Sequence, residues 1–427
     1  MEQVNRFKQP IVPADTGEID FMNQELMECP YHAYSLLREE APVWRDPTTG
    51  FWVVSRYEDV RAILMDPRTF SSSRRKEDEQ VDSKRVQEAN KLYLEKGWLP
   101  DRTLALRDDP EHAQLRTLFD HAFRAGRIKQ LDPYVGELAY RLMREAVAQK
   151  SFEFVRAFAV PFPLIVIGNQ MGVPEEDIWK IKTWTEAFCH RTGLMQKEDS
   201  AFLRNVEQEI EAQHYFQPLF ERLRAQPDGS LLSDLVNEQV PGWGRPLNEN
   251  ELHAEMMADT FVGGSETSTN ALSAGVMLLA RDKDAWRQLK SDPEKYLRGF
   301  IEEVLRLESP VQSRLRRTTR DVEIAGTTIP EGSFVDIRFG SANRDAKRFE
   351  CPEKLDLERR NAATHMAFGS GVHHCLGAPL ARRELFWGFK AFVEMVDDFE
   401  VDEDKSNLRH VPNFWLRSLK ELHVDLT

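Results

Sequence analysis

The sequence predicts a mainly α-helical protein with small β-sheets, an α+β fold. Helical periodicity recurs over residues 128–148, 152–172 and 248–281, and each stretch is long enough for several turns. Short β-rich runs lie near residues 40–57 and 315–340, where glycine and proline interrupt them. A helical chain of this size is expected to fold as one compact unit.

Composition and charge exclude several classes of protein. The 427 residues carry a net charge of −14 and no dominant basic tract, which argues against a nucleic-acid binder. Residues 1–20 lack the apolar core of a signal peptide, and no stretch has the roughly 18–20 apolar residues that span a membrane. The four cysteines are widely scattered: Cys29, Cys189, Cys351 and Cys375. We expect a cytoplasmic monomer, one domain over residues 1–427, whose first 20 residues are a loosely ordered extension.

The first elements can be placed from local signals. Residues 30–41 predict a short helix, and the turn sequence of residues 46–50 separates two β-rich runs, which predicts a strand hairpin. Helical periodicity resumes at residues 57–64. Residues 71–85 carry charges of both signs and few large apolar side chains, so they predict a solvated loop.

The following helices are marked by their first turns and by proline. Pro110 and Glu111 suit a helix start, which places His112 and Arg116 one turn apart on one face. Such a pair is also common on exposed surfaces. Pro161 and Pro163 interrupt the amphipathic stretch 152–172, whereas residues 176–225 predict further helices rich in aromatic side chains.

The stretch Phe368–Ala381 frames one cysteine with glycines. Gly369, Gly371 and Gly377 let the backbone turn tightly and approach a flat ligand. Cys375 comes just before an apolar helical pattern, where free backbone N–H groups and the helix dipole favour a thiolate. Such a thiolate is a ligand for soft metal ions or haem iron.

Cys375 taken by itself allows three other interpretations. A single cysteine in a glycine-rich loop is commonly only a buried side chain. Adjacent His373, His374 and Cys375 cannot converge tetrahedrally on one zinc ion. A nucleophilic cysteine needs a base and an orienting partner, which the sequence neither shows nor excludes.

The full spacing of the loop favours the iron ligand. Phe-Gly-x-Gly-x-His-x-Cys-x-Gly-x-x-Leu-Ala resembles the haem-binding loop of the cytochrome P-450 superfamily at every signature position. The resemblance implies a triangular helical bundle with haem b between a long distal helix and the cysteine-bearing helix. It also implies Cys375 as the iron ligand, with Phe368, Gly369 and Gly377 beside the haem.

The resemblance further implies donors for the haem propionates. His112 and Arg116 match the family's His-x-x-x-Arg pair on a helix that binds one propionate. His373 and a strand arginine match the remaining donors. That arginine is Arg316, with Arg317 as the alternative.

Two adjacent glycines, Gly263 and Gly264, interrupt the long helix predicted over residues 248–281. They cost a helix interior roughly 2 kcal/mol, so we expect either close approach to a ligand or a local widening of the helix. With the following serine, Glu266 and Thr267 match the family's distal-helix motif. The resemblance implies that Thr267 supports dioxygen and Glu266 delivers protons through water.

Four residues are expected to line a substrate pocket. Asp259 lies seven residues before Glu266 and shares a similar helix face, together with Val262. By resemblance, Val311 and a hairpin tip carrying Phe414 turn into the same space. Our hypothesis is that Asp259 meets a polar or basic group of the substrate; a salt bridge or a solvent-exposed carboxylate is the alternative.

A structural cluster is expected before the cysteine loop. Glu303 and Arg306 lie three apart on one helix face and resemble a pair that binds an arginine from a later loop. Either Arg359 or Arg360 can supply that arginine. The resemblance implies that this cluster holds the cysteine loop in place.

The chain contains no recognisable flavin or iron–sulfur segment, so electrons must come from outside. We expect a ferredoxin-type donor with its reductase, docked on a basic patch of Arg116, Arg382 and Arg383. The resemblance implies a monooxygenase that inserts one atom of O2 into a small, mainly apolar organic substrate. A non-catalytic haem protein and a peroxide-using relative are the alternatives, although the latter replaces Glu266-Thr267 with Arg-Pro.

Overall fold

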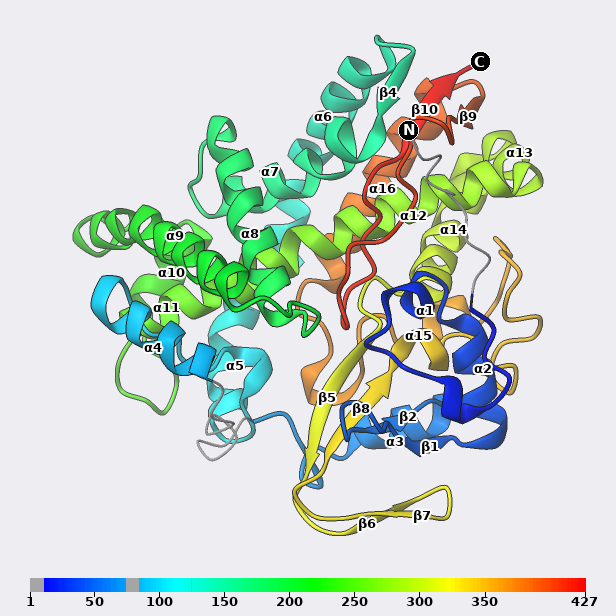
Figure 1. Cartoon of the computed structure of the whole chain (residues 1–427). Coiled ribbons are helices and arrows are strands. Elements are labelled where there is room, and N and C mark those ends of the chain that lie inside the picture. Colours follow the sequence, from blue (N-terminus) through cyan, green and yellow to red (C-terminus); the bar gives the residue numbers. More distant parts are fainter. Residues whose placement is uncertain (1–10, 74–83, 124) are drawn as a thin grey trace.

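The computed structural model describes residues 11–73, 84–123 and 125–427. Residues 1–10 of the expected N-terminal extension and residues 74–83 of the expected charged loop therefore lie outside the described residues. The expected mainly α fold with small β-sheets is confirmed (Figure 1).

The α-helices of the described chain are α1 (Gln24–Glu28), α2 (Tyr31–Glu40), α3 (Tyr57–Met65), α4 (Lys84–Lys96), α5 (Glu111–Ala122), α6 (Ala125–Val147), α7 (Pro161–Gln170), α8 (Ile178–Thr192), α9 (Asp199–Ala225), α10 (Leu231–Asn237), α11 (Glu249–Glu255), α12 (Thr267–Arg281), α13 (Lys283–Ser291), α14 (Pro293–Glu308), α15 (Phe339–Ala342) and α16 (Ala378–Met395). Tighter or wider helical turns are η1 (Thr16–Glu18), η2 (Leu104–Leu106), η3 (Val155–Ala159), η4 (Glu175–Asp177), η5 (Met256–Glu266), η6 (Ala362–Thr364) and η7 (Gly371–His373).

The strands are β1 (Val43–Arg45), β2 (Trp52–Val54), β3 (Phe70–Ser71), β4 (Ser151–Glu153), β5 (Ser313–Thr318), β6 (Val322–Ile324), β7 (Thr327–Ile329), β8 (Phe334–Arg338), β9 (Phe399–Val401) and β10 (His423–Leu426). The largest sheet has the order β1-β2-β8-β5-β3, and only the β2–β8 pair in it is parallel. It joins the two β-rich regions expected near residues 40–57 and 315–340. A second sheet has the order β4-β10-β9, and β6 pairs with β7.

The predicted hairpin between β1 and β2 forms around the side chain of Asp46. Its carboxylate accepts the N–H of Thr48 at 2.8 Å and the hydroxyl of Thr49 at 2.7 Å. Gly50 then adopts a φ of +75°, a left-handed conformation that favours glycine. The turn residues read from the sequence therefore produce the expected reversal.

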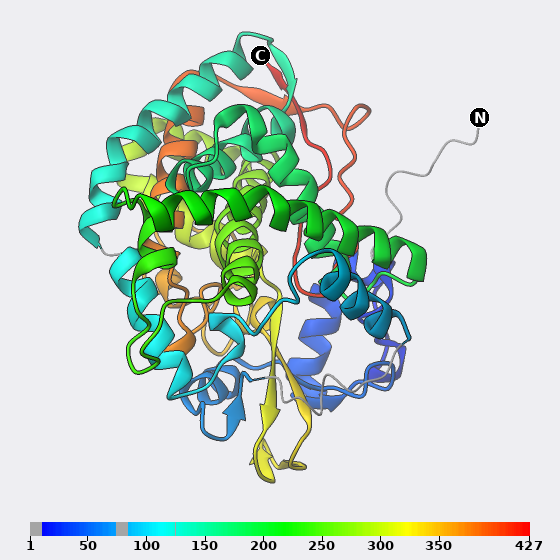
Figure 2. The same cartoon turned by 90° about the vertical axis from the view of Figure 1, so that its left-hand side faces the viewer.

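A continuous helical path crosses the middle of the molecule. It consists of α11, η5 and α12, which follow one another without interruption (Figure 1). Helix α9 crosses in front of this path in Figure 2, and α8 packs against η5. The second half of the path packs against α14 and α16. This arrangement sets the distal helix opposite the helix that follows Cys375.

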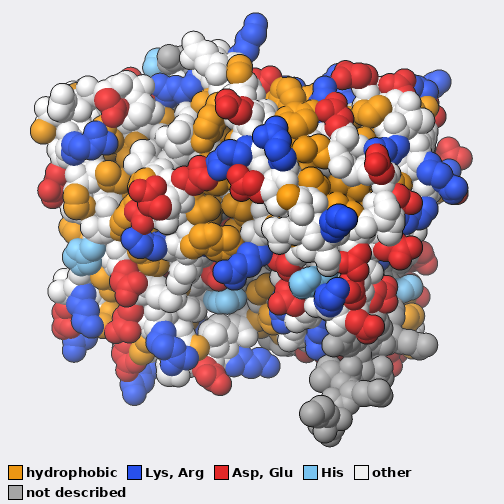
Figure 3. Space-filling model, turned by 90° about the horizontal axis from the view of Figure 1, so that it is seen from above, with side chains coloured by type: hydrophobic (Ala, Val, Ile, Leu, Met, Phe, Trp, Pro, Cys, Tyr) orange, Lys and Arg blue, Asp and Glu red, His pale blue; other side chains and the backbone are white. Residues whose placement is uncertain are grey.

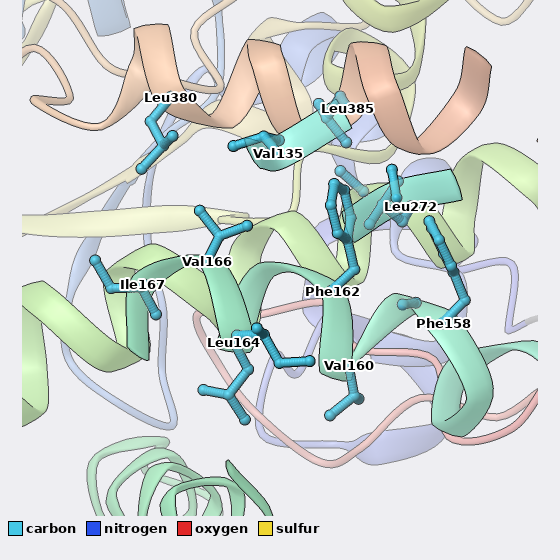
Figure 4. Close-up of a cluster of buried hydrophobic side chains, with 14 of the residues drawn as sticks. Val135, Phe158, Val160, Phe162, Leu164, Val166, Ile167, Leu272, Leu380 and Leu385 are labelled. Carbon is cyan, nitrogen blue, oxygen red and sulfur yellow. The ribbon is translucent and has the colours of Figure 1, made fainter. Parts of the chain in front are cut away.

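The largest hydrophobic core surrounds α7. Every residue of α7 from Pro161 to Gly168 is buried. Figure 4 shows Phe162 and Val166 of α7 pointing toward residues of α6, α12 and α16, whereas Leu164 points to the opposite side of the helix. The break that Pro161 predicts in the stretch 152–172 is present, whereas Pro163 lies inside α7 and the stretch does not begin as a helix. Residues 151–153 pair with β10 instead, and Pro161 starts a new helix because proline lacks the N–H that a helix interior needs.

The outer surface carries mixed charges. Over the face shown in Figure 3, acidic and basic side chains are interspersed with hydrophobic ones. The net charge of −14 is therefore not gathered as one acidic field on that face. None of the described helices combines the length and the apolarity needed to cross a bilayer.

The predicted structural cluster forms around Glu303. Both Glu303 and Arg306 are fully buried. The Glu303 carboxylate accepts Nε of Arg306 at 2.5 Å and a second guanidinium nitrogen at 3.0 Å. Nε of Arg359 lies 3.0 Å from the same carboxylate. Arg359, rather than Arg360, therefore completes the cluster.

The two guanidinium groups of this cluster also bind the backbone that leads to the cysteine loop. They donate to the carbonyl oxygens of Asn343, Glu350, Cys351, Pro352 and Lys354. The Asn343 side chain in turn accepts the N–H of Met366 at 2.6 Å. One buried carboxylate thus supports a long segment whose own backbone hydrogen bonds form only short local turns.

Replacing Glu303 by alanine is expected to lower the free energy of unfolding by about 3–5 kcal/mol, because two buried guanidinium groups lose their counter-charge. Denaturant unfolding of the purified protein measures this. Glu294→Ala is the matched control, since Glu294 is an exposed residue of the same helix that pairs with Lys390 and should cost less than about 1 kcal/mol. Equal unfolding midpoints for the two variants would contradict the prediction.

Candidate functional site

The cysteine loop depends on two glycines in left-handed conformations. Gly369 has a φ of +66° and Gly371 a φ of +70°. A Cβ on Gly371 would lie only 2.3 Å from the carbonyl oxygen of Leu64, so the contact with α3 admits no side chain. Gly377 has an ordinary φ of −77° and does not use the freedom expected of it. The N–H of Cys375 donates to the carbonyl oxygen of Phe368 at 2.9 Å, and this hydrogen bond closes the loop.

The electrostatics of Cys375 differ from the expectation. Burial raises the pKa of the Cys375 thiol, and the N–H groups of Gly377 and Ala378 with the charge of Arg116 offset only part of this. Desolvation therefore outweighs the helix N-terminus. The cysteine nevertheless keeps accessible surface. A side chain that is both desolvated and accessible lines an internal hollow, and a cation beside the sulfur would compensate a thiolate there.

Two predicted imidazoles meet beside the loop. The rings of His112 and His373 lie 4.1 Å apart between centroids. The Nε2 atom of each is buried and has no hydrogen-bond partner among the described residues. Burial, followed by the charges of Arg316, His112 and Arg116, lowers the pKa of His373 to about 3. Both rings therefore hold an unused polar atom in a strongly cationic neighbourhood.

The two predicted arginines converge on the same place. Arg316 is 9% exposed, and its guanidinium donates only to the Leu315 carbonyl, at 2.8 Å. In the described chain no carboxylate lies within 4.0 Å of it. Arg116 donates to the His374 carbonyl at 2.9 Å and pairs with Asp120 at 2.9 Å. The structure thus brings together all four residues predicted to bind propionates.

The distal helix is widened at the paired glycines. Residues 256–266 form a π-helix, which is the local widening that Gly263 and Gly264 suggested. A Cβ on Gly264 would press on Ile167 at 3.1 Å, so this glycine allows α7 to pack closely. A Cβ on Gly263 would meet only the Ala258 carbonyl oxygen, at 3.7 Å, and this residue faces open space.

The acid and the alcohol of the distal helix have separate partners. The hydroxyl of Thr267 donates to the Gly263 carbonyl at 2.9 Å. The Glu266 carboxylate is buried and turned toward α8, where Lys182 Nζ lies 2.8 and 2.9 Å from its two oxygens. The hydroxyl of Thr185 donates to it at 2.8 Å. The sequence reasoning missed Lys182, because nothing in the chain links it to a residue more than 80 positions later.

The electrostatics of Lys182 follow from this pairing. Burial alone lowers its pKa, but the charges of Glu266 and Glu186 outweigh burial, so the pKa is raised. The ammonium and the Glu266 carboxylate therefore remain a buried ion pair between α8 and the distal helix.

The expected pocket residues divide into two groups. Val262 and Val311 are half-buried, and Val311 bridges to Leu416 of the C-terminal hairpin. The placement of Phe414 in the pocket was wrong. Its ring is 0% exposed and packs between Phe51 and Arg338 in the N-terminal core. The apolar residues packed around it hold it away from the hollow.

Asp259 has partners within the protein. Its Oδ2 accepts the N–H of Ala105 at 3.1 Å, and its side chain interacts with those of Thr103 and Glu255. Burial raises the pKa of Asp259, and these hydrogen bonds oppose the rise. The basic group near it is the protein's own Arg314. Asp259 thus binds the loop before α5 through Ala105, and its contact with a polar or basic group of the substrate stays a prediction.

The predicted basic patch is present but largely neutralised. The side chains of its three arginines are 22% to 35% exposed. Each has a carboxylate partner: Asp120 for Arg116, Glu302 for Arg382 and Asp132 for Arg383. The patch offers donors at the surface, but it carries less net charge than its sequence suggests.

The residues around Cys375 fit a haem. A haem brings two carboxylates and an iron, and the site offers unpartnered buried donors beside a cysteine sulfur. The glycine-rich loop and the open side of Gly263 leave room for a flat group. Among the described residues, the one group of three potential metal ligands lies elsewhere, at His121, Asp234 and Glu238.

Comparison with known proteins gives a consistent result. The family model described as Cytochrome P450 matches residues 40–420. The polyketide biosynthesis cytochrome P450 PksS of Bacillus subtilis is 32% identical over 95% of this chain and 97% of its own. The cytochrome P450 monooxygenase PikC of Streptomyces venezuelae is 31% identical, over 95% and 93%. The solved structure of cytochrome P450 CREJ with (4-ethylphenyl) dihydrogen phosphate is similar with a TM-score of 0.85 and 28% identity, covering 94% of this chain and 98% of that one.

Replacing Gly371 by alanine is expected to lower the free energy of unfolding by about 1–3 kcal/mol, because the residue has a positive φ and its Cβ would strike the Leu64 carbonyl. Gly377→Ala is the matched control. There the φ is ordinary and the nearest atom, Cys375 Sγ, lies 3.9 Å from the added Cβ. Thermal and denaturant unfolding compare the two variants, and equal losses would refute the strain argument.

Proposed function

The chain belongs to the cytochrome P450 family of haem monooxygenases, and on that premise we propose that Cys375 binds the iron of haem b. The observation that carries the proposal is the set of unpartnered buried donors around the cysteine loop. His112, His373 and Arg316 suit two propionate groups, since hydrogen bonds to carboxylates would satisfy the two orphaned Nε2 atoms and give the Arg316 guanidinium, which now donates only to the Leu315 carbonyl, a counter-charge. Arg116 supports the loop from α5.

The chain's own residues divide the remaining tasks. A haem held through Cys375 would supply the activation of dioxygen and the insertion of one oxygen atom into a C–H bond. Because Thr267 already donates its hydroxyl hydrogen to Gly263, its oxygen is left to accept a hydrogen bond from a donor in the hollow. Gly263, without a side chain, keeps that approach open.

Proton delivery is assigned to Glu266 with Lys182. The carboxylate holds the Lys182 ammonium at 2.8 Å, so the pair stores an exchangeable proton next to Thr267. To reach the hollow, Glu266 must turn away from Lys182 and Thr185 or pass the proton through water. Because Glu266 is buried between α8 and the distal helix, bulk water cannot exchange protons with it directly.

The substrate and the electron donor follow from the surroundings. Half-buried Val262 and Val311 suit a small, mainly apolar organic molecule. A ferredoxin-type protein with its reductase is the proposed source of electrons, docked over Arg116, Arg382 and Arg383. Because these arginines already have carboxylate partners, their attraction for an acidic donor should be modest and screened by salt.

Thiolate ligation predicts a strongly red-shifted Soret band for the carbon-monoxide complex of the dithionite-reduced protein. Cys375→His is expected to bind haem but to lose that shift, because imidazole donates less charge to the iron. Absorption difference spectra and haem content measure both. A variant spectrum identical to that of the unaltered protein would overturn Cys375 as the ligand.

Replacing Thr267 by alanine is expected to slow product formation by about 100-fold or more, with NADH still consumed, because an acceptor next to the reacting oxygen is lost. Thr267→Ser keeps the hydroxyl and should retain most of the coupling between NADH and product. Product and NADH are quantified together, on a substrate chosen by its spin-state shift. Equal turnover driven by peroxide without an electron donor would favour the peroxide-using alternative instead.

A further inference from the structure

Arg314 lies beside the site and forms no ion pair within 4.0 Å with any described residue. It lies on β5, and strand alternation places it on the same sheet face as Arg316. Their partners across the ladder, Ile337 and Val335, are both 0% exposed. Arg314, in contrast, is exposed. One strand face thus carries two arginines, of which Arg316 is buried beside His373 and Arg314 reaches into open space.

The surroundings of Arg314 identify that space as internal. Burial lowers the pKa of the Arg314 guanidinium, while the charges of Asp259, Cys375 and Cys189 oppose the change. These three residues come from the distal helix, the cysteine loop and α8. An accessible side chain that is desolvated and sits among these elements faces the hollow above Cys375, where the substrate must lie.

The hydrogen bonding of Arg314 is incomplete. Its one hydrogen bond joins a guanidinium nitrogen to the Ser313 carbonyl at 3.3 Å. Within the described ranges no carboxylate comes within 4.0 Å of it. The nearby Asp259 is already bound to the N–H of Ala105. A guanidinium has five N–H donors, and desolvating them without a partner is unfavourable.

We propose that Arg314 binds an anionic group of the substrate, a carboxylate or a phosphate monoester, while the apolar body of the molecule packs toward Val262 and Val311. The proposal rests on the proposed function, because it takes the hollow above Cys375 as the place of the substrate. The planar guanidinium matches two oxygens of either anion. It would fix one end of the substrate and thereby select which carbon faces the reacting centre.

A haem propionate is the competing partner for Arg314. Among the donors for the propionates, His112 and His373 touch, and Arg316 and Arg116 act on His373. The charge of Arg314 acts on Arg316 but not on His373, and Asp259 of the distal helix acts on Arg314. Arg314 therefore lies between the propionate donors and the distal helix, and the haem content of its variants decides between the two anions.

The test compares acids with their neutral amides. Haem-loaded protein is titrated with n-alkanoates, 4-alkylbenzoates and alkyl phosphate monoesters, and with alkanamides and 4-alkylbenzamides of the same chain length. Spin-state spectra and calorimetry both measure binding, and calorimetry does not depend on the type of iron ligand. The unaltered protein should bind the best acid at least about tenfold more tightly than its amide, and the better of the two anion classes identifies the headgroup.

Arg314→Gln should remove that preference and leave amide binding within about twofold, and Arg314→Lys should keep part of it. Arg317→Gln is the matched control, because Arg317 lies on the opposite face of the same strand, against Phe334. Unchanged acid binding by Arg314→Gln, or amides bound as tightly as acids, would overturn the proposal.

Haem content of each variant separates the remaining outcomes. Loss of haem from Arg314→Gln would reassign the residue to a propionate and overturn the proposal. A carbon-monoxide spectrum without the thiolate signature, alongside an intact preference for acids by calorimetry, would refute the proposed function alone and support the anion site.

Discussion

One buried carboxylate, that of Glu303, neutralises two buried guanidinium groups, and the approach to Cys375 depends on this contact. The other N–H groups of Arg306 and Arg359 donate to carbonyl groups of residues 343–354, a segment with little regular secondary structure. Such a segment would otherwise leave buried carbonyls unsatisfied. The cluster therefore fixes the position of this segment. The hydrogen bond from the Met366 N–H to the Asn343 side chain connects the segment to the start of the cysteine loop.

Around Cys375 the opposite condition holds. Two imidazole Nε2 atoms are buried without a hydrogen-bond partner among the described residues, and none of the carboxylates of those residues lies within 4.0 Å of the Arg316 guanidinium. Leaving a buried polar group unpaired costs about 1–3 kcal/mol. The proposed propionate groups would give these atoms partners. The charges of the Glu303 cluster are neutralised within the chain, which suits a structural role, whereas the unpaired groups around Cys375 suit the binding of a ligand.

Helix α8 connects the remaining parts of the site. Lys182 and Thr185 hold Glu266 of the distal helix, while the Cys189 carbonyl accepts the Asn413 side chain of the C-terminal hairpin. Further along, Arg191 pairs with Glu209 of α9. A displacement of α8 would therefore alter the acid, the hairpin and the neighbouring helix together. These contacts make α8 part of the site rather than a simple cover.

The sequence by itself determined the features that depend on local backbone geometry. Glycines at 369 and 371 marked left-handed turns, paired glycines marked a widened helix, and periodicity marked the long helices. The cysteine spacing identified the family, and the four residues predicted to bind propionates lie near one another. These features can be predicted without the tertiary structure, because each depends on residues within one or two helical turns of one another.

Only the tertiary structure decided the partners of charged and aromatic side chains. It chose Arg359 over Arg360, turned Glu266 toward Lys182, bound Asp259 to a loop N–H and buried Phe414 in another core. It also left Arg314 without a carboxylate within 4.0 Å in the part of the chain that the structure describes. These outcomes depend on which surfaces dock and how far each charge is desolvated. Neither the docking of surfaces nor the desolvation of a charge can be predicted from the spacing of residues along the chain.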